Sequence, residues 1–83
     1  MSNRYTEKSH QIITALGGKE NIEQVYSCAT RLRVEVKNTQ LVLWDQMKSV
    51  GALGIIESGM VVQAIFGAET EQYKQEMIRI LAL

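Results

Sequence analysis

The stretch from Ser27 to Arg33 combines the residue types that phosphoryl chemistry requires. Cys28 is the only cysteine of the chain, and Arg31 and Arg33 follow it closely. A free cysteine has a pKa near about 8.5, and neighbouring positive charge lowers that pKa, so that a reactive thiolate forms at neutral pH. Arginine binds phosphate oxygens through two parallel N–H donors. The stretch therefore predicts a nucleophilic sulfur beside two guanidinium groups, an arrangement that can accept a phosphoryl group.

The residues around this sulfur can complete an anion site. Cys28 falls between two predicted strands, so Ala29 and Thr30 are expected to form a turn whose exposed backbone N–H groups cradle an anion. The hydroxyl of Thr30 adds a further donor. Gln63, on a later predicted strand, is expected to face the same side of the sheet and to support this turn. The predicted phosphate-binding residues are therefore Ala29, Thr30 and Gln63.

Each of these features also has a purely structural interpretation. A lone cysteine in a small domain is more often a small buried hydrophobe than a nucleophile, and an Arg-x-Arg pair on a strand usually belongs to a solvated face. A turn between strands is a poor place to bury a thiol, however, which favours a functional Cys28. His10 is the only histidine, and one histidine with one cysteine cannot form a structural zinc site. We therefore predict an exposed His10, no metal and no cofactor.

A strict alternation predicts the strand that carries the arginines. Apolar residues occupy one side and charged residues the other: Leu32, Val34 and Val36 against Arg31, Arg33, Glu35 and Lys37. This period of two is typical of a half-buried strand. Both arginines therefore leave the same face of the sheet, opposite the face that packs against the core.

Glycines and apolar periodicity divide the rest of the chain. We expect helices over residues 4–16, 41–50 and 70–81, and strands over the second half of 21–27 and over 31–37, 53–57 and 60–66. Gly17 is the expected C-cap of the first helix, and Ser58-Gly59 the expected hairpin turn. The expected core-facing residues of the three helices are Ser9, Ile12, Ile13 and Leu16; Leu43 or Trp44, Met47 and Val50; and Tyr73, Met77, Ile80 and Leu81.

Consecutive strands with short links predict antiparallel pairing, and helices with one apolar stripe must cover one face of the sheet. The expected fold class is α+β: a two-layer sandwich in which a four-stranded antiparallel sheet carries three helices on one face and leaves the other face open.

Length and composition limit the classes of protein that need to be considered. The 83 residues fit a single domain over 1–83, and we expect the isolated domain to be a monomer. Nine basic and nine acidic residues cancel, which argues against a general nucleic-acid binder. A single cysteine forms no internal disulfide, which suits a reducing cytosol. No apolar signal region and no apolar run of about 20 residues is visible, so we expect a cytoplasmic protein.

The segment from Asn21 to Val36 closely resembles a known motif. Asn21-Ile22, five further residues and then Cys28-Ala29-Thr30-Arg31-Leu32-Arg33-Val34-Glu35-Val36 are similar to the cysteine phosphorylation motif of the enzyme IIB domains in the glucose superfamily of the bacterial phosphoenolpyruvate-dependent sugar phosphotransferase system. The resemblance continues through residues 16–22, 51–55 and 62–67 and covers nearly the whole chain from Ile12. Asn38 lies where the family motif often ends in Asp or Gln, and Tyr26 and Ser27 lie where relatives vary.

The resemblance implies a function and two partners. In such domains the cysteine takes a phosphoryl group from a histidine of an enzyme IIA protein or domain and passes it to a sugar bound by the membrane IIC domain. Cys28 would be the nucleophile and carrier, and Arg31 and Arg33 would hold the phosphoryl oxygens. The domain would then work in the cytoplasm, at the inner face of the cell membrane, through association with or fusion to IIC.

Two other classes of function stay open at this point. The first is a non-catalytic regulatory or ligand-binding α+β module; an RNA-binding version would need aromatic residues exposed on the sheet, and we expect none there. The second is a thiol redox sensor built on Cys28, which would need a resolving cysteine from a partner.

Overall fold

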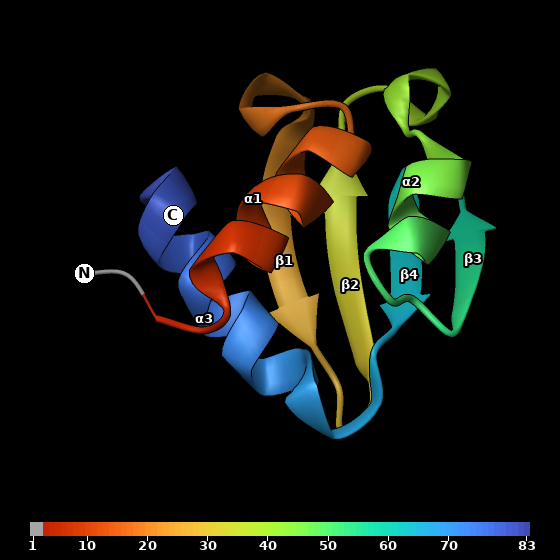
Figure 1. Ribbon diagram of the computed structural model, residues 1–83. Helices are drawn as coiled ribbons and strands as arrows, with labels where there is room; N and C mark the ends of the chain where they lie inside the picture. Colours follow the sequence, from red (N-terminus) through yellow and green to blue (C-terminus); the bar gives the residue numbers. More distant parts are fainter. Residues whose placement is uncertain (1–2) are drawn as a thin grey trace.

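The chain alternates helices with pairs of strands in the order predicted from the sequence (Figure 1). The computed structural model describes residues 3–83. The helices and strands are α1 (Thr6–Ala15), β1 (Ile22–Ser27), β2 (Arg31–Val36), α2 (Trp44–Ser49), β3 (Gly54–Ser58), β4 (Val61–Ile65) and α3 (Thr70–Leu81), with 3-10 turns η1 (Lys19–Asn21), η2 (Thr39–Leu41) and η3 (Gly67–Glu69) between them.

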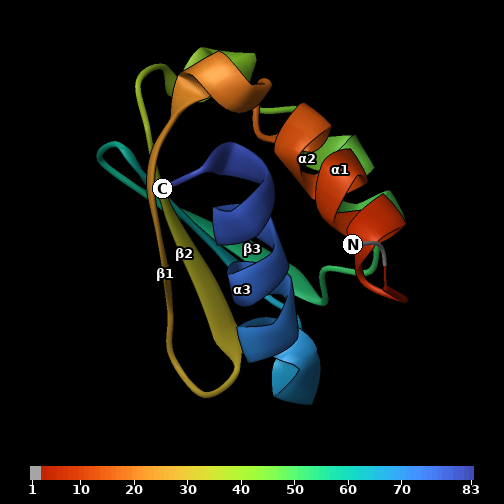
Figure 2. The same cartoon turned by 90° about the vertical axis from the view of Figure 1, so that its left-hand side faces the viewer.

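The four strands form one antiparallel sheet in the order β1-β2-β4-β3. Figure 2 shows the helices together on one side of this sheet. The predicted fold class is therefore confirmed. The turn between β3 and β4 consists of Gly59 and Met60, one residue later than expected, and Gly59 has a φ of +60°, a left-handed conformation that glycine adopts without strain.

Strand register separates a core face from an open face. Leu32 of β2 pairs with Ala64 of β4, and Val34 pairs with Val62; all four side chains are at most 1% exposed. Side chains of successive residues point to opposite faces of a sheet. The alternation predicted for β2 is thus confirmed, and the arginine side chains project from the face that the helices do not cover.

The helices contribute the core faces that their periodicity predicted. Buried residues include Ser9, Ile12, Ile13 and Leu16 from the first helix, Met47 and Val50 from the second, and Tyr73, Met77 and Leu81 from the third. Ile80 is partly buried. Of the two alternatives in the second helix, Trp44 packs against the core and Leu43 is exposed.

The second helix is shorter than predicted because its first residues bond elsewhere. The Asn38 side chain accepts a hydrogen bond from the N–H of Gln40 at 2.9 Å, which starts η2. The N–H of Leu43 then donates to the carbonyl of Ala15 at 2.6 Å, tying this segment to the end of α1. Val42 and Leu43 have ψ angles of 128° and 87°, outside the helical range, so the helix begins at Trp44. The first strand, by contrast, is longer than predicted and begins at Ile22.

Asn21 holds the open end of the β1–β2 hairpin. Its buried side chain donates from Nδ2 to the carbonyls of Leu16 at 2.7 Å and Asn38 at 3.0 Å, and its Oδ1 accepts from the Asn38 N–H at 2.9 Å. Gly17 has a φ of +102°, and a Cβ there would lie 2.6 Å from Asn21 Nδ2. The predicted cap glycine is thus required by conformation and by space, and the hairpin is anchored at the end opposite Cys28.

Candidate functional site

Cys28 lies in the tight loop that joins β1 to β2. Its N–H donates to the carbonyl of Arg31 at 2.8 Å, and its side chain is exposed. The carbonyl of Thr30 accepts from the N–H groups of Phe66 and Gly67, each at 3.1 Å. The loop is therefore closed on itself and also attached to the segment that precedes α3.

The open sheet face carries the predicted site residues in cross-strand register. Tyr26 pairs with Arg33 across β1 and β2, and Arg33 pairs with Gln63 across β2 and β4. Directly paired residues place their side chains on the same face. Cys28 follows Tyr26 by two positions, so the strand period directs it toward this same face.

A shallow hollow brings the sulfur and one arginine together. It has a volume of about 440 Å³ and is lined by Tyr26, Ser27, Cys28, Arg33, Glu35 and Val61. Arg31 instead contacts Gln63, its Nη1 donating to Gln63 Oε1 at 3.4 Å. The structure therefore joins the predicted residues as two neighbouring pairs, Cys28 with Arg33 and Arg31 with Gln63.

The remaining predicted residues form the tip of the loop. Ala29 and Thr30 are exposed. Among residues 3–83, no group accepts a hydrogen bond from the backbone N–H of either residue. Two unpaired N–H groups beside the cysteine are suited to binding an anion.

Tyr26 and Glu35 belong to the hollow although no site role was predicted for them. Tyr26 is 49% exposed, so the expectation of no exposed aromatic residue on the sheet is wrong. The signal was present in the sequence: residue 26 precedes the cysteine by two positions and must share its face. Glu35 was expected on the open face, and it lines the same hollow as Arg33.

Behind the loop, Ser27 contacts the first turn of α3. Its Oγ donates to Glu71 Oε1 at 2.7 Å. This hydrogen bond is the largest cause that lowers the pKa of Glu71, followed by the hydrogen bond from Gln75 and the charge of Lys74. The partners lie 44 residues apart, and no sequence pattern links them.

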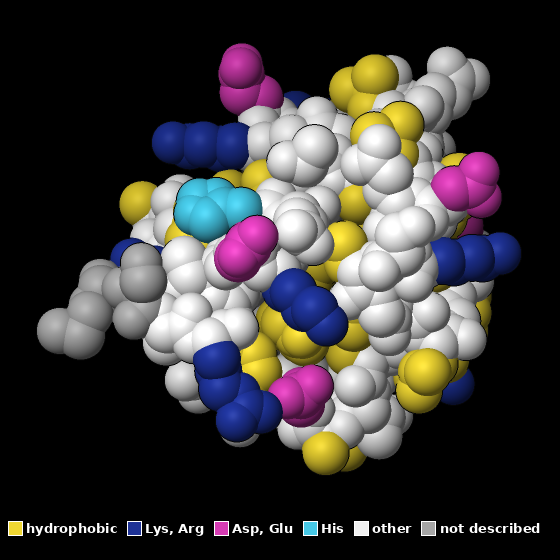
Figure 3. Space-filling model, in the orientation of Figure 1, with side chains coloured by type: hydrophobic (Ala, Val, Ile, Leu, Met, Phe, Trp, Pro, Cys, Tyr) yellow, Lys and Arg dark blue, Asp and Glu magenta, His cyan; other side chains and the backbone are white. Residues whose placement is uncertain are grey.

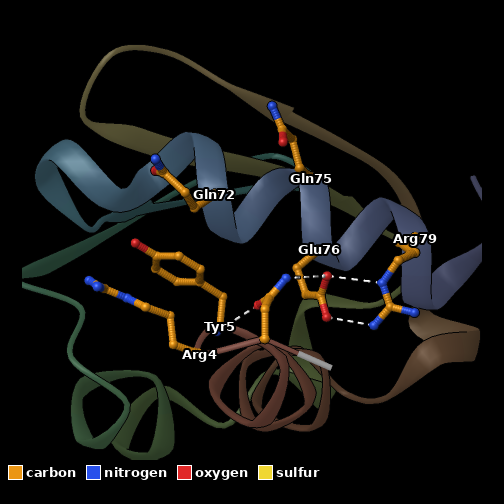
Figure 4. A pocket seen from close by; sticks show the side chains of 7 residues that line it. Arg4, Tyr5, Gln72, Gln75, Glu76 and Arg79 are labelled. Atoms are coloured by element: carbon orange, nitrogen blue, oxygen red, sulfur yellow. Dashed lines mark hydrogen bonds and ion pairs between the residues drawn. The ribbon is translucent and has the colours of Figure 1, made fainter. Parts of the chain in front are cut away.

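A second hollow lies between the N-terminal residues and α3 (Figure 4), lined by Asn3, Arg4, Tyr5, Gln72, Gln75, Glu76 and Arg79. Glu76 is only 4% exposed, and Arg79 donates to its carboxylate from Nε at 2.9 Å and from Nη2 at 2.5 Å. These hydrogen bonds, together with one from the Thr6 hydroxyl, lower the pKa of Glu76 to about 2. This carboxylate therefore attaches Asn3 and Thr6 to α3.

The helix-bearing side presents mixed charges. Figure 3 shows basic and acidic side chains interspersed there, and His10 is exposed on α1. Within residues 3–83, no three His, Cys, Asp or Glu side chains gather closely enough to hold a metal ion. In the same part of the chain, every helix is too short or too polar to cross a bilayer.

Comparisons with known proteins agree on one family. The family model described as phosphotransferase system, EIIB matches residues 10–42, which include the Cys28 loop. The chain is 41% identical over 76 residues to the PTS system glucoside-specific EIICBA component of Staphylococcus carnosus (strain TM300), an alignment that covers 92% of this chain and 11% of that protein.

A solved structure agrees with the sequence relatives. The crystal structure of one domain of the PTS system, IIabc component from Clostridium difficile superimposes with a TM-score of 0.82 at 26% sequence identity, covering 99% of this chain and 88% of that one. The chain therefore belongs to the EIIB domains of the phosphotransferase system, of the glucose and glucoside type.

Proposed function

We propose that Cys28 is the phosphoryl carrier of this domain. It accepts the group from a phosphohistidine of an enzyme IIA protein or domain and passes it to a sugar held by a membrane IIC domain. The observation that carries this proposal is that the exposed sulfur-bearing residue and Arg33 line one hollow on the open sheet face. This shared lining supports a site in which the nucleophile and a cationic oxygen ligand act on the same phosphorus atom.

The two transfer steps balance at the sulfur. In the first, the Cys28 thiolate attacks phosphorus, the N–P bond of the phosphohistidine breaks, and the imidazole takes up the proton that the thiol released. In the second, a sugar hydroxyl oxygen attacks the same phosphorus, the S–P bond breaks, and the proton of the hydroxyl returns to the sulfur. Each displacement needs an in-line approach and stabilisation of the oxygen charge more than additional covalent chemistry.

Each neighbouring residue has a role in these steps. Arg33 binds phosphoryl oxygens through its planar fork of donors. Arg31, held by Gln63, adds a second positive charge at the edge of the site. The free N–H groups of Ala29 and Thr30 complete the cradle.

An exposed site suits a carrier that is visited by two proteins in turn. A deep pocket would exclude one or both partners, whereas a loop on an open sheet face can be approached by IIA and then by IIC. The proposal places the domain on the cytoplasmic side of the membrane, where both partners can reach it.

The test is phosphorylation of the intact domain. The general phosphotransferase proteins, a phosphorylated IIA and phosphoenolpyruvate should add one phosphoryl group, detected by mass and located on Cys28 by peptide mapping. Cys28→Ser should remove the label, while His10→Gln, which removes the only histidine, should leave it unchanged. Labelling that persists in Cys28→Ser would refute the assignment.

The same assay separates the alternatives. A non-catalytic regulatory or ligand-binding module would take up no phosphoryl group from any IIA. A redox sensor would form mixed disulfides on oxidation and likewise stay unlabelled. Both alternatives lose their support if the label is chased onto sugar when IIC-containing membranes are added.

A further inference from the structure

The Cys28 loop is braced from both sides by the segment that begins α3. The residue before the cysteine, Ser27, donates from Oγ to Glu71 Oε1 at 2.7 Å. Two residues after the cysteine, the Thr30 carbonyl accepts from the N–H groups of Phe66 and Gly67. Figure 1 shows this loop and the beginning of α3 at the same end of the sheet. We propose that Ser27 and Glu71 are positioning residues for phosphoryl transfer, because their hydrogen bond fixes the place of Cys28.

The loop depends on such a brace. Cys28, Ala29 and Thr30 all have exposed side chains, so core packing does not restrain them. Within the loop, one hydrogen bond joins the Cys28 N–H to the Arg31 carbonyl. Segments with few buried contacts open and move at low free-energy cost, so contacts from outside the loop limit its motion.

Ser27 lines the hollow together with Cys28, while its hydroxyl is bonded to α3. Ser27 pairs with Leu32, which is fully buried on the helix side, and directly paired residues share a face. Cys28, the next residue, points to the opposite side. Ser27 Oγ therefore supports the nucleophile from behind and acts through its position.

Glu71 is a preorganised acceptor. Its Oε2 accepts from Gln75 Nε2 at 3.2 Å and lies 3.7 Å from Lys74 Nζ, which leaves Oε1 directed to Ser27. A glutamate carboxylate is ionised at neutral pH, and hydrogen bonds to ionised acceptors are stronger than neutral ones. The Thr30 brace uses backbone groups that any sequence supplies, whereas the Ser27–Glu71 hydrogen bond belongs to these two side chains.

This proposal rests on the proposed function, and single-turnover kinetics test it. Transfer from a phosphorylated IIA to the intact domain is followed at increasing donor concentration. A misplacement of about 1 Å costs about 100-fold in rate, and a loosened loop still samples the productive position. We therefore expect Ser27→Ala and Glu71→Ala each to lower the maximal rate constant about tenfold, with the half-saturating donor concentration unchanged.

Three further variants sharpen the test. Ser27→Thr keeps the hydroxyl and should transfer at nearly the wild-type rate. The double variant S27A/E71A should be no slower than either single variant, because each change removes the same hydrogen bond. Gln72→Ala, an exposed neighbour on the same turn of α3, is the control and should be unaffected.

Several outcomes would overturn the proposal. Wild-type rates in Ser27→Ala or Glu71→Ala would do so, as would additive losses in the double variant, which would indicate that Glu71 acts on the site independently of Ser27. A raised half-saturating concentration with an unchanged maximal rate would instead make these residues partner contacts.

A second measurement separates this proposal from the proposed function. Backbone order parameters of the Ala29 and Thr30 amides should fall in Ser27→Ala from about 0.85 toward about 0.6, while the strands keep their values. If wild-type Cys28 takes up no phosphoryl group, the proposed function fails, and the order parameters still decide whether the hydrogen bond positions the loop. Unchanged order parameters would refute it.

Discussion

Replacing Arg33 with alanine should slow the phosphorylation of Cys28 more than any other single loss of positive charge in the domain. Arg33 lines the same hollow as Cys28, whereas Arg31 contacts Gln63 at 3.4 Å. A hydrogen bond that involves a charged group contributes about 1.5–3 kcal/mol. Because about 1.4 kcal/mol corresponds to a factor of ten in rate, Arg33→Ala should reduce the transfer rate constant about 10- to 150-fold. Arg31→Ala should cost less, because its guanidinium lies beside the hollow.

The assay is single-turnover transfer from phosphorylated IIA, quenched in alkali and quantified by mass. Arg33→Lys separates charge from geometry: lysine keeps the charge but lacks the planar fork, so its rate should fall between those of wild type and Arg33→Ala. Lys37→Ala, an exposed charge loss just beyond β2, is the matched control. Thermal unfolding should be nearly unchanged in all four variants, since these side chains are exposed. A larger loss in Arg31→Ala than in Arg33→Ala would refute the assignment of the hollow, and normal rates in both would refute the arginine roles altogether.

Three further predictions concern the scaffold. Gly17→Ala should lower the free energy of unfolding by at least about 2 kcal/mol in denaturant titrations, because φ is +102° and the new Cβ would meet Asn21; an unchanged midpoint would contradict this. Met77→Ala should cost about 2–5 kcal/mol, since Met77 is fully buried; a smaller loss would mean that the core refills the space. The pKa of Glu76 is lowered from 4.5 to about 2, so the ionised carboxylate stabilises the fold fully above pH 4.5, and this contribution is lost as pH falls toward 2. The difference in unfolding free energy between wild type and Glu76→Gln should therefore shrink over that interval. A constant difference would show that Arg79 does not stabilise the charge of Glu76.

Local patterns predicted the parts of the fold that depend on backbone geometry. The third helix has the predicted bounds of Thr70 to Leu81, because its apolar stripe and its helical spacing are properties of neighbouring residues. Both faces of β2 were predicted for the same reason. The prediction of the second helix was wrong at its beginning, where the Leu43 N–H donates to the carbonyl of Ala15, a contact between distant residues.

The candidate site divides in the same way. The loop cysteine, the arginine pair and their common face were predictable, and so was the place of Tyr26 on that face. The burial of Glu76 could not be predicted, because it requires the segment that contains Asn3 and Thr6 to pack on α3. The Ser27–Glu71 hydrogen bond could not be predicted either, because it joins a strand end to a helical residue 44 positions later in the chain.

Local sequence patterns were enough to predict which residues are candidates for the chemistry and which face of their strand they occupy, since the period of two is fixed by the local backbone. Which strand lies beside β2 depends on contacts between distant parts of the chain. By pairing β4 with it, the fold sets Gln63 opposite Arg33 and within reach of Arg31. It also brings the beginning of α3 against the Cys28 loop. These placements follow because every element contributes side chains to one common core. Contacts between elements that are distant in the chain leave no local sequence pattern from which they could be predicted.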